Sequence, residues 1–199
     1  GSKYFVTFID DFSRYNCVYI LKNKSEVLDK FKEFVEMAEN LTGRKLKKLR
    51  SDNGGEYISK DFDEYLKSRG ILKDNTIPYT PQQNGVAERA NRTLMELVRS
   101  MLFHAKLPAE FWAEAVVTAA YLRNRSPTSC FEGVTPHERW YGSKPDVGHL
   151  RVFGCSAYVH VPKEKRIKLD ERSMKCIFIG YPNGSKGYKF YHPASGKML

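Results

Sequence analysis

The chain has 199 residues, enough for one good-sized domain or for one domain with a small module. A hydrophobic content of 41% and an aromatic content of 13% are enough to build a core, which excludes an intrinsically disordered chain. The net charge of +10 indicates a polyanionic partner, nucleic acid ahead of an acidic membrane, but a basic protein without a special partner has the same totals.

The opening residues predict a hairpin and a helix. Two runs rich in β-branched and aromatic residues, 4–9 and 17–21, flank the turn sequence DDFSRYN and predict an antiparallel hairpin. Apolar residues at helical spacing follow. They predict a helix that begins after an N-cap at Ser25 and ends at Gly43.

The next segment continues the alternation of strands and helices. A short strand is predicted at 45–51, and a helix over 59–70 with Ser59 as its cap, followed by a weak strand near Ile71. After a loop rich in proline, two longer helices are expected at about 86–103 and 108–122.

Beyond Arg123 the composition changes. Three prolines and three glycines in the stretch SPTSCFEGVTPHERWYGSKPDVGH predict a connector, and short β runs with turns follow it. We therefore predict an α/β domain over 1–124, a linker over 125–150 and a small β-barrel-like module over 151–199, which we expect to be incomplete.

The cysteines and histidines predict no metal site. No cysteine lies in a CxxC pair, and the histidines lack metal-ligand spacing. Cys17, Cys155 and Cys176 lie in apolar runs and are expected to be reduced core residues, typical of an intracellular protein. No apolar run approaches the roughly 20 residues that span a membrane, and no signal peptide is expected.

Two carboxylates are candidates for catalysis. Asp52 ends a predicted strand, where α/β sheets place their chemistry, and Glu88 begins a predicted helix 36 positions later. Carboxylates from two such elements can hold Mg²⁺ together with a substrate phosphate. Each also has a simpler interpretation: Asp-Asn-Gly is a common turn sequence, and an acid near a helix N-terminus favours the helix dipole.

Five blocks together resemble the integrase core of copia-type retrotransposons: YFVTFIDDFSRY, RSDNGGEY, PYTPQQNGVAER, RVFGCSAYV and KCIFIGY. They cover essentially the whole chain in one collinear order. This family is similar to retroviral integrases and DDE transposases, which share an RNase H-like fold and whose last two catalytic acids are separated by 35 residues, as Asp52 and Glu88 are. The resemblance implies that these two residues are the second and third catalytic acids and bind Mg²⁺ or Mn²⁺.

The first acid of the triad is expected to lie outside this chain. In the family it lies on a strand upstream of the segment that matches YFVTFIDDFSRY, so the resemblance implies an N-terminally truncated core whose strands 4–9 and 45–51 have exposed edges. Asp10 and Asp11 are not expected to replace it. The resemblance implies an RNase H-like sheet in which strand 4–9 runs antiparallel to the strand ending at Asp52, so that its end points to the opposite edge. A role of Asp10 in the hairpin turn is therefore predicted.

The resemblance also implies residues that contact DNA. Arg92 and Arg99 lie on one helix face with Glu88, and Arg92 has the alternative of a simple i,i+4 pair with Glu88. Gln83 and Asn84 lie in the loop before that helix, where hydrogen bonds to DNA are possible. Two basic tracts, 44–50 and 163–168, are either DNA-binding stripes or solvated faces.

The predicted function is that of a retrotransposon integrase core, which inserts element DNA into target DNA by metal-dependent 3′-end processing and strand transfer. The family implies DNA and further copies of the chain as partners, and action in the nucleus after assembly in a cytoplasmic particle. Without the first acid, we expect this chain to be inactive alone. The alternatives are a non-catalytic DNA-binding or assembly module from a decayed or domesticated element, and an RNase H-like nuclease, which does not explain the β module.

Overall fold

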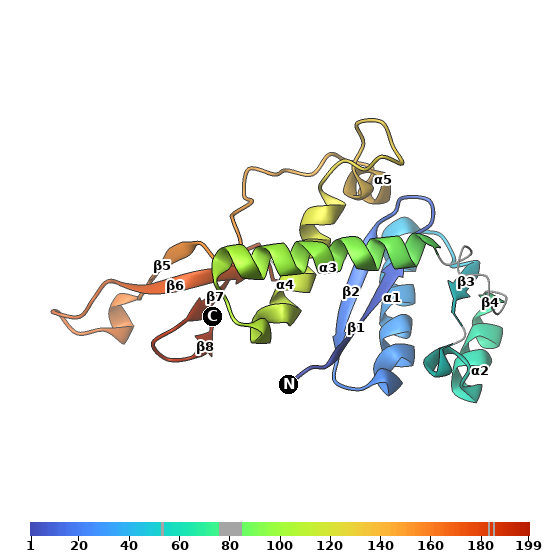
Figure 1. Cartoon of the computed structure of the whole chain (residues 1–199), viewed down its shortest axis with the longest axis horizontal. Helices are drawn as coiled ribbons and strands as arrows, with labels where there is room; N and C mark the ends of the chain where they lie inside the picture. The colour runs from blue at the N-terminus through green and yellow to red at the C-terminus, as the bar shows by residue number, and fades with distance from the viewer. Residues whose placement is uncertain (53, 76–84, 183, 185) are drawn as a thin grey trace. The chain divides into compact units, whose positions relative to one another are not determined.

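The computed structural model describes residues 1–52, 54–75, 85–182, 184 and 186–199 (Figure 1). The chain divides into two compact units. The first unit contains Gly1–Leu94 and Arg123–Pro145, and the second unit contains Met95–Leu122 and Asp146–Leu199. The domain boundaries drawn from the sequence, at 124 and 150, remain a prediction.

The first unit contains two strand pairs. β1 (Tyr4–Ile9) pairs antiparallel with β2 (Asn16–Leu21), which confirms the predicted hairpin. β3 (Lys48–Ser51) pairs in parallel with β4 (Leu72–Asn75). Among the described residues no strand joins one pair to the other. Each pair therefore keeps an edge without a strand partner in this part of the chain, as the sequence predicts.

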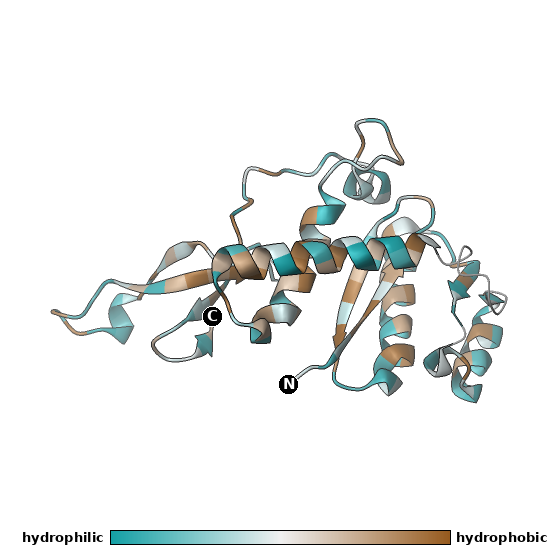
Figure 2. Ribbon diagram, viewed as in Figure 1, coloured by the Kyte–Doolittle hydropathy of each residue, from teal (hydrophilic) through white to brown (hydrophobic). Residues whose placement is uncertain are grey.

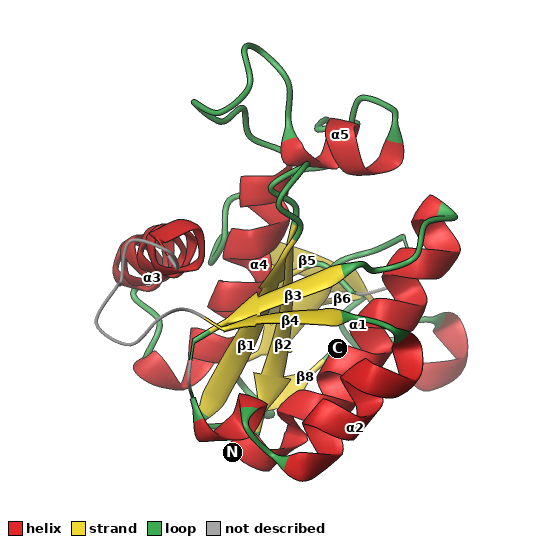
Figure 3. Cartoon of the chain, turned by 90° about the vertical axis from the view of Figure 1, so that its right-hand side faces the viewer, coloured by secondary structure: helices red, strands yellow, loops and turns green. Residues whose placement is uncertain are grey.

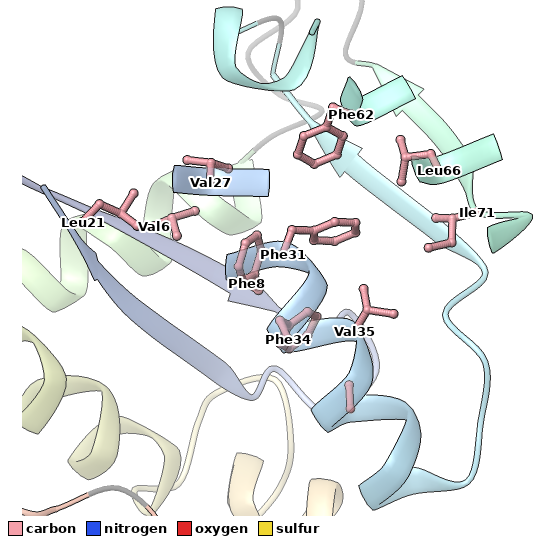
Figure 4. Packing of buried hydrophobic residues seen from close by; sticks show 11 residues of the cluster. Val6, Phe8, Leu21, Val27, Phe31, Phe34, Val35, Phe62, Leu66 and Ile71 are labelled. Atoms are coloured by element: carbon pink, nitrogen blue, oxygen red, sulfur yellow. The ribbon is translucent and has the colours of Figure 1, made fainter. Parts of the chain in front are cut away.

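Helix α1 (Val27–Thr42) supports both strand pairs (Figure 4). Its Phe31 is fully buried and lies between Phe8 of β1 and Phe62, with ring centroids 5.5 Å and 5.2 Å apart. Phe62 belongs to α2 (Lys60–Arg69), which packs beside β4 (Figure 3). One core thus holds together two strand pairs that share no hydrogen bonds.

The helix ends follow from local chemistry, with one correction. The cap predicted at Ser25 is wrong: Asn23 forms a capping box with Glu26 around a 3₁₀ turn (Lys24–Glu26), and α1 begins at Val27. The Glu26 carboxylate accepts a hydrogen bond of 2.9 Å from the backbone N–H of Asn23, and Ser25 lies inside the turn that this contact closes. Ser59 caps α2 as predicted, by accepting a hydrogen bond from the backbone N–H of Phe62.

The segment predicted to be a connector contains a helix, α5 (Pro136–Tyr141), capped by Thr135. Trp140 stacks on Tyr15 at 5.2 Å, and the Arg139 guanidinium lies over the Phe12 ring, so this segment packs against the β1–β2 turn. Proline and glycine obscured the helix in the sequence because they mark its two ends, at Pro136 and Gly142.

The second unit combines helices with a β module. A 3₁₀ turn (Ala109–Phe111) leads into α4 (Trp112–Asn124), whose last two residues belong to the first unit. The module is a four-stranded antiparallel sheet in the order β5-β6-β7-β8. Its strands are β5 (Ser156–His160), β6 (Ser173–Gly180), β7 (Lys189–His192) and β8 (Lys197–Met198), with a 3₁₀ turn (Lys163–Lys165) between the first two.

Two glycines show how closely the helices and the sheet pack within the second unit. A Cβ on Gly154 would lie 2.2 Å from Cβ of Ala105, and a Cβ on Gly180 would lie 2.5 Å from Oγ1 of Thr118. Both glycines also have positive φ, of 83° and 140°. The sheet therefore packs directly on helix backbone and short side chains.

Helix α3 (Gly85–Ala105) runs from the first unit into the second. Its colour bands in Figure 2 alternate between hydrophilic and hydrophobic, as expected of a helix with one apolar face. Leu94 and Val98 on that face are almost fully buried. In the described part of the chain, no helix is long and apolar enough to cross a membrane.

Candidate metal and DNA site

Asp52 lies directly after β3, as predicted, and is exposed. Its Oδ1 accepts a hydrogen bond of 3.2 Å from the backbone N–H of Gly54, which holds the carboxylate over the turn that follows the strand. Asp52 forms no ion pair with any described residue, so its charge is available to a cation. The common-turn interpretation and the metal-ligand interpretation are therefore compatible at this residue.

Glu56 is a second carboxylate at this turn, which the sequence reasoning missed. A Cβ placed on Gly54 would lie 3.1 Å from Oδ1 of Asp52 and 3.1 Å from Oε2 of Glu56, so both carboxylates border the same glycine. The signal in the sequence is the i,i+4 spacing of the two acids in DNGGE, which spans a turn that brings them back together.

Hydrogen bonds from Lys73 hold the turn that follows Asp52. It continues as a 3₁₀ turn (Gly55–Tyr57), and Nζ of Lys73 donates hydrogen bonds to the backbone oxygen of Tyr57 at 2.7 Å and to Asp63 at 2.6 Å. Burial raises the pKa of Tyr57 to about 12, and the negative charges of Asp52 and Glu56 contribute to the increase. The phenol thus stays neutral beside the two carboxylates.

Glu88 lies in the first turn of α3 and is exposed, as is Arg92 one turn later. No ion pair joins them among the described residues, so the simple Glu88–Arg92 pair considered above is not formed. Arg89, also exposed, lies 3.7 Å from the position of a Cβ on Gly85 and is a cation that the sequence reasoning did not single out. The roles of these residues remain predictions.

The other predicted DNA contacts are Arg99, Gln83 and Asn84. Arg99 is exposed on the part of α3 that belongs to the second unit. Gln83 and Asn84 lie outside the described residues.

Oxygen ligands of the kind that Mg²⁺ prefers are present at the two predicted positions. Asp52 and Glu88 are exposed carboxylates, and neither forms an ion pair with a basic side chain among the described residues. Their chemistry therefore fits a divalent metal. No three His, Cys, Asp or Glu side chains among the described residues lie close enough together to hold one ion.

Asp10 forms the hairpin turn, which confirms its predicted structural role. Its Oδ2 accepts hydrogen bonds from the backbone N–H of Ser13 at 2.7 Å and from the Ser13 hydroxyl at 2.6 Å. Asp11 forms an ion pair with Arg14, whose φ of 59° belongs to the same turn.

The basic tract 44–50 is partly neutralised. Lys48 and Arg50 both form ion pairs with Asp74 across the β3–β4 pair, at 2.8 Å and 3.2 Å, and these contacts lower the pKa of Asp74. Lys45 pairs with Glu39 on α1 at 2.9 Å. These ion pairs favour a solvated, charge-balanced face over a DNA-binding stripe.

Comparison with known families assigns both parts of the chain. Residues 1–81 match the integrase core domain family, and residues 155–199 match the retroviral polymerase SH3-like domain family. The first range contains Asp52 but ends before Glu88. The chain thus combines an integrase core with an SH3-like module.

Relatives from plants and yeast match nearly the whole chain. It is 55% identical over 199 residues to the Retrovirus-related Pol polyprotein from transposon TNT 1-94 of Nicotiana tabacum, and 36% identical over 196 residues to that from transposon RE2 of Arabidopsis thaliana. It is 28% identical to the Transposon Ty1-LR3 Gag-Pol polyprotein of Saccharomyces cerevisiae. The chain belongs to the copia-type retrotransposon integrases. The matches extend over 98–100% of this chain but over only 11–15% of the polyproteins.

Solved structures show the same fold. A simian T-cell lymphotropic virus intasome in complex with the PP2A regulatory subunit B56 gamma matches with a TM-score of 0.57 and 18% identity, over 94% of this chain and 68% of the other. The HTLV-2 integrase catalytic core domain in complex with magnesium, in a dimeric form, matches with a TM-score of 0.51 and 22% identity, over 67% and 81%. These likenesses confirm the predicted integrase-core α/β fold.

Proposed function

We propose that this chain is the DNA-handling part of a retrotransposon integrase, which trims the 3′ ends of element DNA and joins them to target DNA. The observation that carries the proposal is that Asp52 and Glu88, at the family's spacing, are both exposed carboxylates without a cation partner among the described residues. Membership of the integrase family supports the reaction class of polynucleotidyl transfer.

Asp52 and Glu88 would hold Mg²⁺ or Mn²⁺, and the HTLV-2 catalytic core, which binds magnesium, supports this choice of metal. The bound ion would lower the pKa of the attacking water or 3′-hydroxyl and stabilise the leaving oxygen. The two side chains supply carboxylate oxygens, and the hydrogen bond from Gly54 to Asp52 orients one of them. Because the described residues hold no group of three ligands, a third carboxylate would come from elsewhere.

DNA would be held through its phosphates. Arg92 and Arg99 provide exposed positive charge on α3, and Gln83 and Asn84 provide amides in the preceding loop. The intasome and the dimeric catalytic core among the solved relatives support action as a multimer, which two element ends require. We propose that the multimer acts in the nucleus, after assembly in a cytoplasmic particle.

One observation favours the second candidate, a non-catalytic DNA-binding or assembly module. No three potential metal ligands meet in the described part of the chain. Such a module would bind DNA through Arg92 and Arg99 without needing Asp52 or Glu88.

Two measurements on the chain separate the candidates. In a salt titration of duplex DNA binding, Arg92→Ala should weaken binding and reduce the slope of log K against log salt by about 0.9 if Arg92 contacts one phosphate. Glu96→Ala, on the same exposed face, is the matched control and should not reduce the slope. An unchanged slope for Arg92→Ala removes the predicted phosphate contact.

Strand joining with Mn²⁺ is the second measurement. We expect the isolated chain not to join DNA, and we expect joining when a strand carrying the missing carboxylate is supplied in front of Tyr4, with Asp52→Asn abolishing it. Joining that survives Asp52→Asn would contradict the assignment of Asp52. Failure of the supplemented protein, with DNA binding intact, would favour the non-catalytic module.

A further inference from the structure

A hydrogen bond joins the hairpin to the helix that carries Glu88. The Thr7 hydroxyl on β1 donates to Oδ1 of Asn91 on α3 at 2.9 Å, between residues 84 positions apart in the sequence. Both residues are half-buried and belong to the first unit. Neither has a role in the function proposed above.

Thr7 points away from the main core. Its neighbours on β1, Val6 and Phe8, are buried in the core cluster formed with α1, and successive side chains of a strand point to opposite faces. Thr7 therefore projects from the other face of the hairpin, where its hydroxyl meets α3. The strand lies between α1 on one face and the beginning of α3 on the other.

Asn91 lies at the border between the buried and the exposed faces of α3. With 3.6 residues per turn, it is separated from Glu88 by about 60° around the helix axis and from Arg92 by about 100°. Leu94, one turn after Asn91, is 1% exposed, while Glu88 and Arg92 are exposed. A contact at this border limits rotation of the helix about its axis more than apolar packing alone, because a hydrogen bond has a direction.

We propose that Thr7 is a positioning residue: through Asn91 it fixes the rotation of the first turns of α3, and so the direction in which Glu88 and Arg92 project. The inference rests on the proposed function for its consequence, because Glu88 and Arg92 matter to catalysis and DNA binding only there. The contact itself is independent of that function. Catalytic groups must be held within about 0.5 Å of their productive geometry, and this hydrogen bond adds a directional restraint to the apolar packing of α3.

The variants that test this are Thr7→Val and Thr7→Ser. Valine keeps the shape and the β propensity of threonine but has no hydroxyl, whereas serine keeps the hydroxyl. Asn91→Ala removes the acceptor of the same hydrogen bond. It replaces Thr7→Val in the test if Thr7→Val does not fold. Equilibrium unfolding in urea reports which of the variants are folded.

The first measurement uses the chain without DNA. Backbone NMR shifts and amide hydrogen exchange for 86–94 should change in Thr7→Val and in Asn91→Ala, and should stay close to wild type in Thr7→Ser. Equal spectra for all variants and wild type would overturn the proposal. So would equal changes in Thr7→Val and Thr7→Ser, because the hydroxyl would then not be the cause.

The second measurement is a double-mutant cycle for affinity to a duplex DNA end. Thr7→Val should weaken binding about fivefold, the factor of one ordinary hydrogen bond, but should have little further effect in an Arg92→Ala background. Full additivity would overturn the positioning role. If Arg92→Ala alone leaves affinity unchanged, the proposed DNA contact fails, and the NMR measurement still decides whether Thr7 positions the helix.

Discussion

At the scale of single residues, Gly54 controls the geometry of the candidate metal ligands. Its φ of −58° is accessible to any residue, so backbone strain does not require glycine here. The requirement is space: a Cβ would lie 3.1 Å from carboxylate oxygens of both Asp52 and Glu56. The glycine lets the backbone N–H approach Asp52 without pushing the carboxylate aside.

Gly54→Ala should therefore displace the Asp52 carboxylate and weaken Mn²⁺ binding by about tenfold, the effect expected when a group that orients a metal ligand is disturbed. Electron paramagnetic resonance of free Mn²⁺ during titration measures this affinity. Gly55→Ala is the matched control, because a Cβ there would meet no atom within 4 Å. Equal affinities for the two variants would show that Gly54 has no such role.

Cys17 provides a pH-dependent test of the core. Burial, assisted by the negative charge of Asp10, raises the pKa of Cys17 from 9.0 to about 12. The folded state thus favours the neutral thiol. Its contribution to stability is complete below pH 9 and is lost as the pH rises from 9 to 12, because the unfolded chain releases this proton first.

Under reducing conditions, the free energy of unfolding should fall between pH 9 and pH 10 more steeply in the wild type than in Cys17→Ala. Urea unfolding at half-unit pH steps measures the difference. Cys130→Ala, at an exposed thiol, should retain the wild-type slope. If Cys17→Ala has the wild-type slope as well, burial does not raise the pKa of the Cys17 thiol.

At the scale of secondary-structure elements, α1 is the support shared by the two strand pairs. Phe31→Ala removes a fully buried ring that contacts β1 through Phe8 and α2 through Phe62. We expect a loss of about 3–5 kcal/mol in stability. Amide exchange should accelerate in both β1–β2 and β3–β4.

The control for this change is Phe103→Ala, at a ring that is 88% exposed, which should alter stability by no more than about 0.5 kcal/mol. Faster exchange confined to one strand pair in Phe31→Ala would contradict the idea of a shared core.

The elements that the sequence predicted well have strong local signals. The β1–β2 hairpin has dense β-branched and aromatic runs, and α2 has both a serine cap and a terminal glycine. The cap predicted at Ser25 is wrong because two residues capable of capping lie close together, and the local capping box between Asn23 and Glu26 decides between them. α5 was missed because six residues are too few to show helical periodicity.

The candidate site was predictable only in part, for a similar reason. The positions of Asp52 at a strand end and Glu88 in a first helical turn follow from local pattern. The approach of Glu56 to Gly54 and the contact between Thr7 and Asn91 depend on turn geometry and on packing between distant segments. Neither leaves a periodic trace in the sequence.

At the scale of the whole molecule, one hydrophobic core is shared by the two strand pairs of the first unit. β1 and β3 belong to pairs that share no hydrogen bonds in the described part of the chain, although residues of both pairs pack in one core cluster. Strand edges without a partner can accept other strands. No group of three potential metal ligands lies together among the residues that the structure describes.

The central claim is that Asp52 and Glu88 share a divalent metal. A crystal structure with Mn²⁺ tests it most directly, through the anomalous signal of manganese. The account predicts a peak within about 2.0–2.3 Å of one carboxylate oxygen from each residue, and its loss in Glu88→Gln. A peak bound by Asp52 and Glu56 with Glu88 remote, or no peak at either predicted ligand, would contradict it.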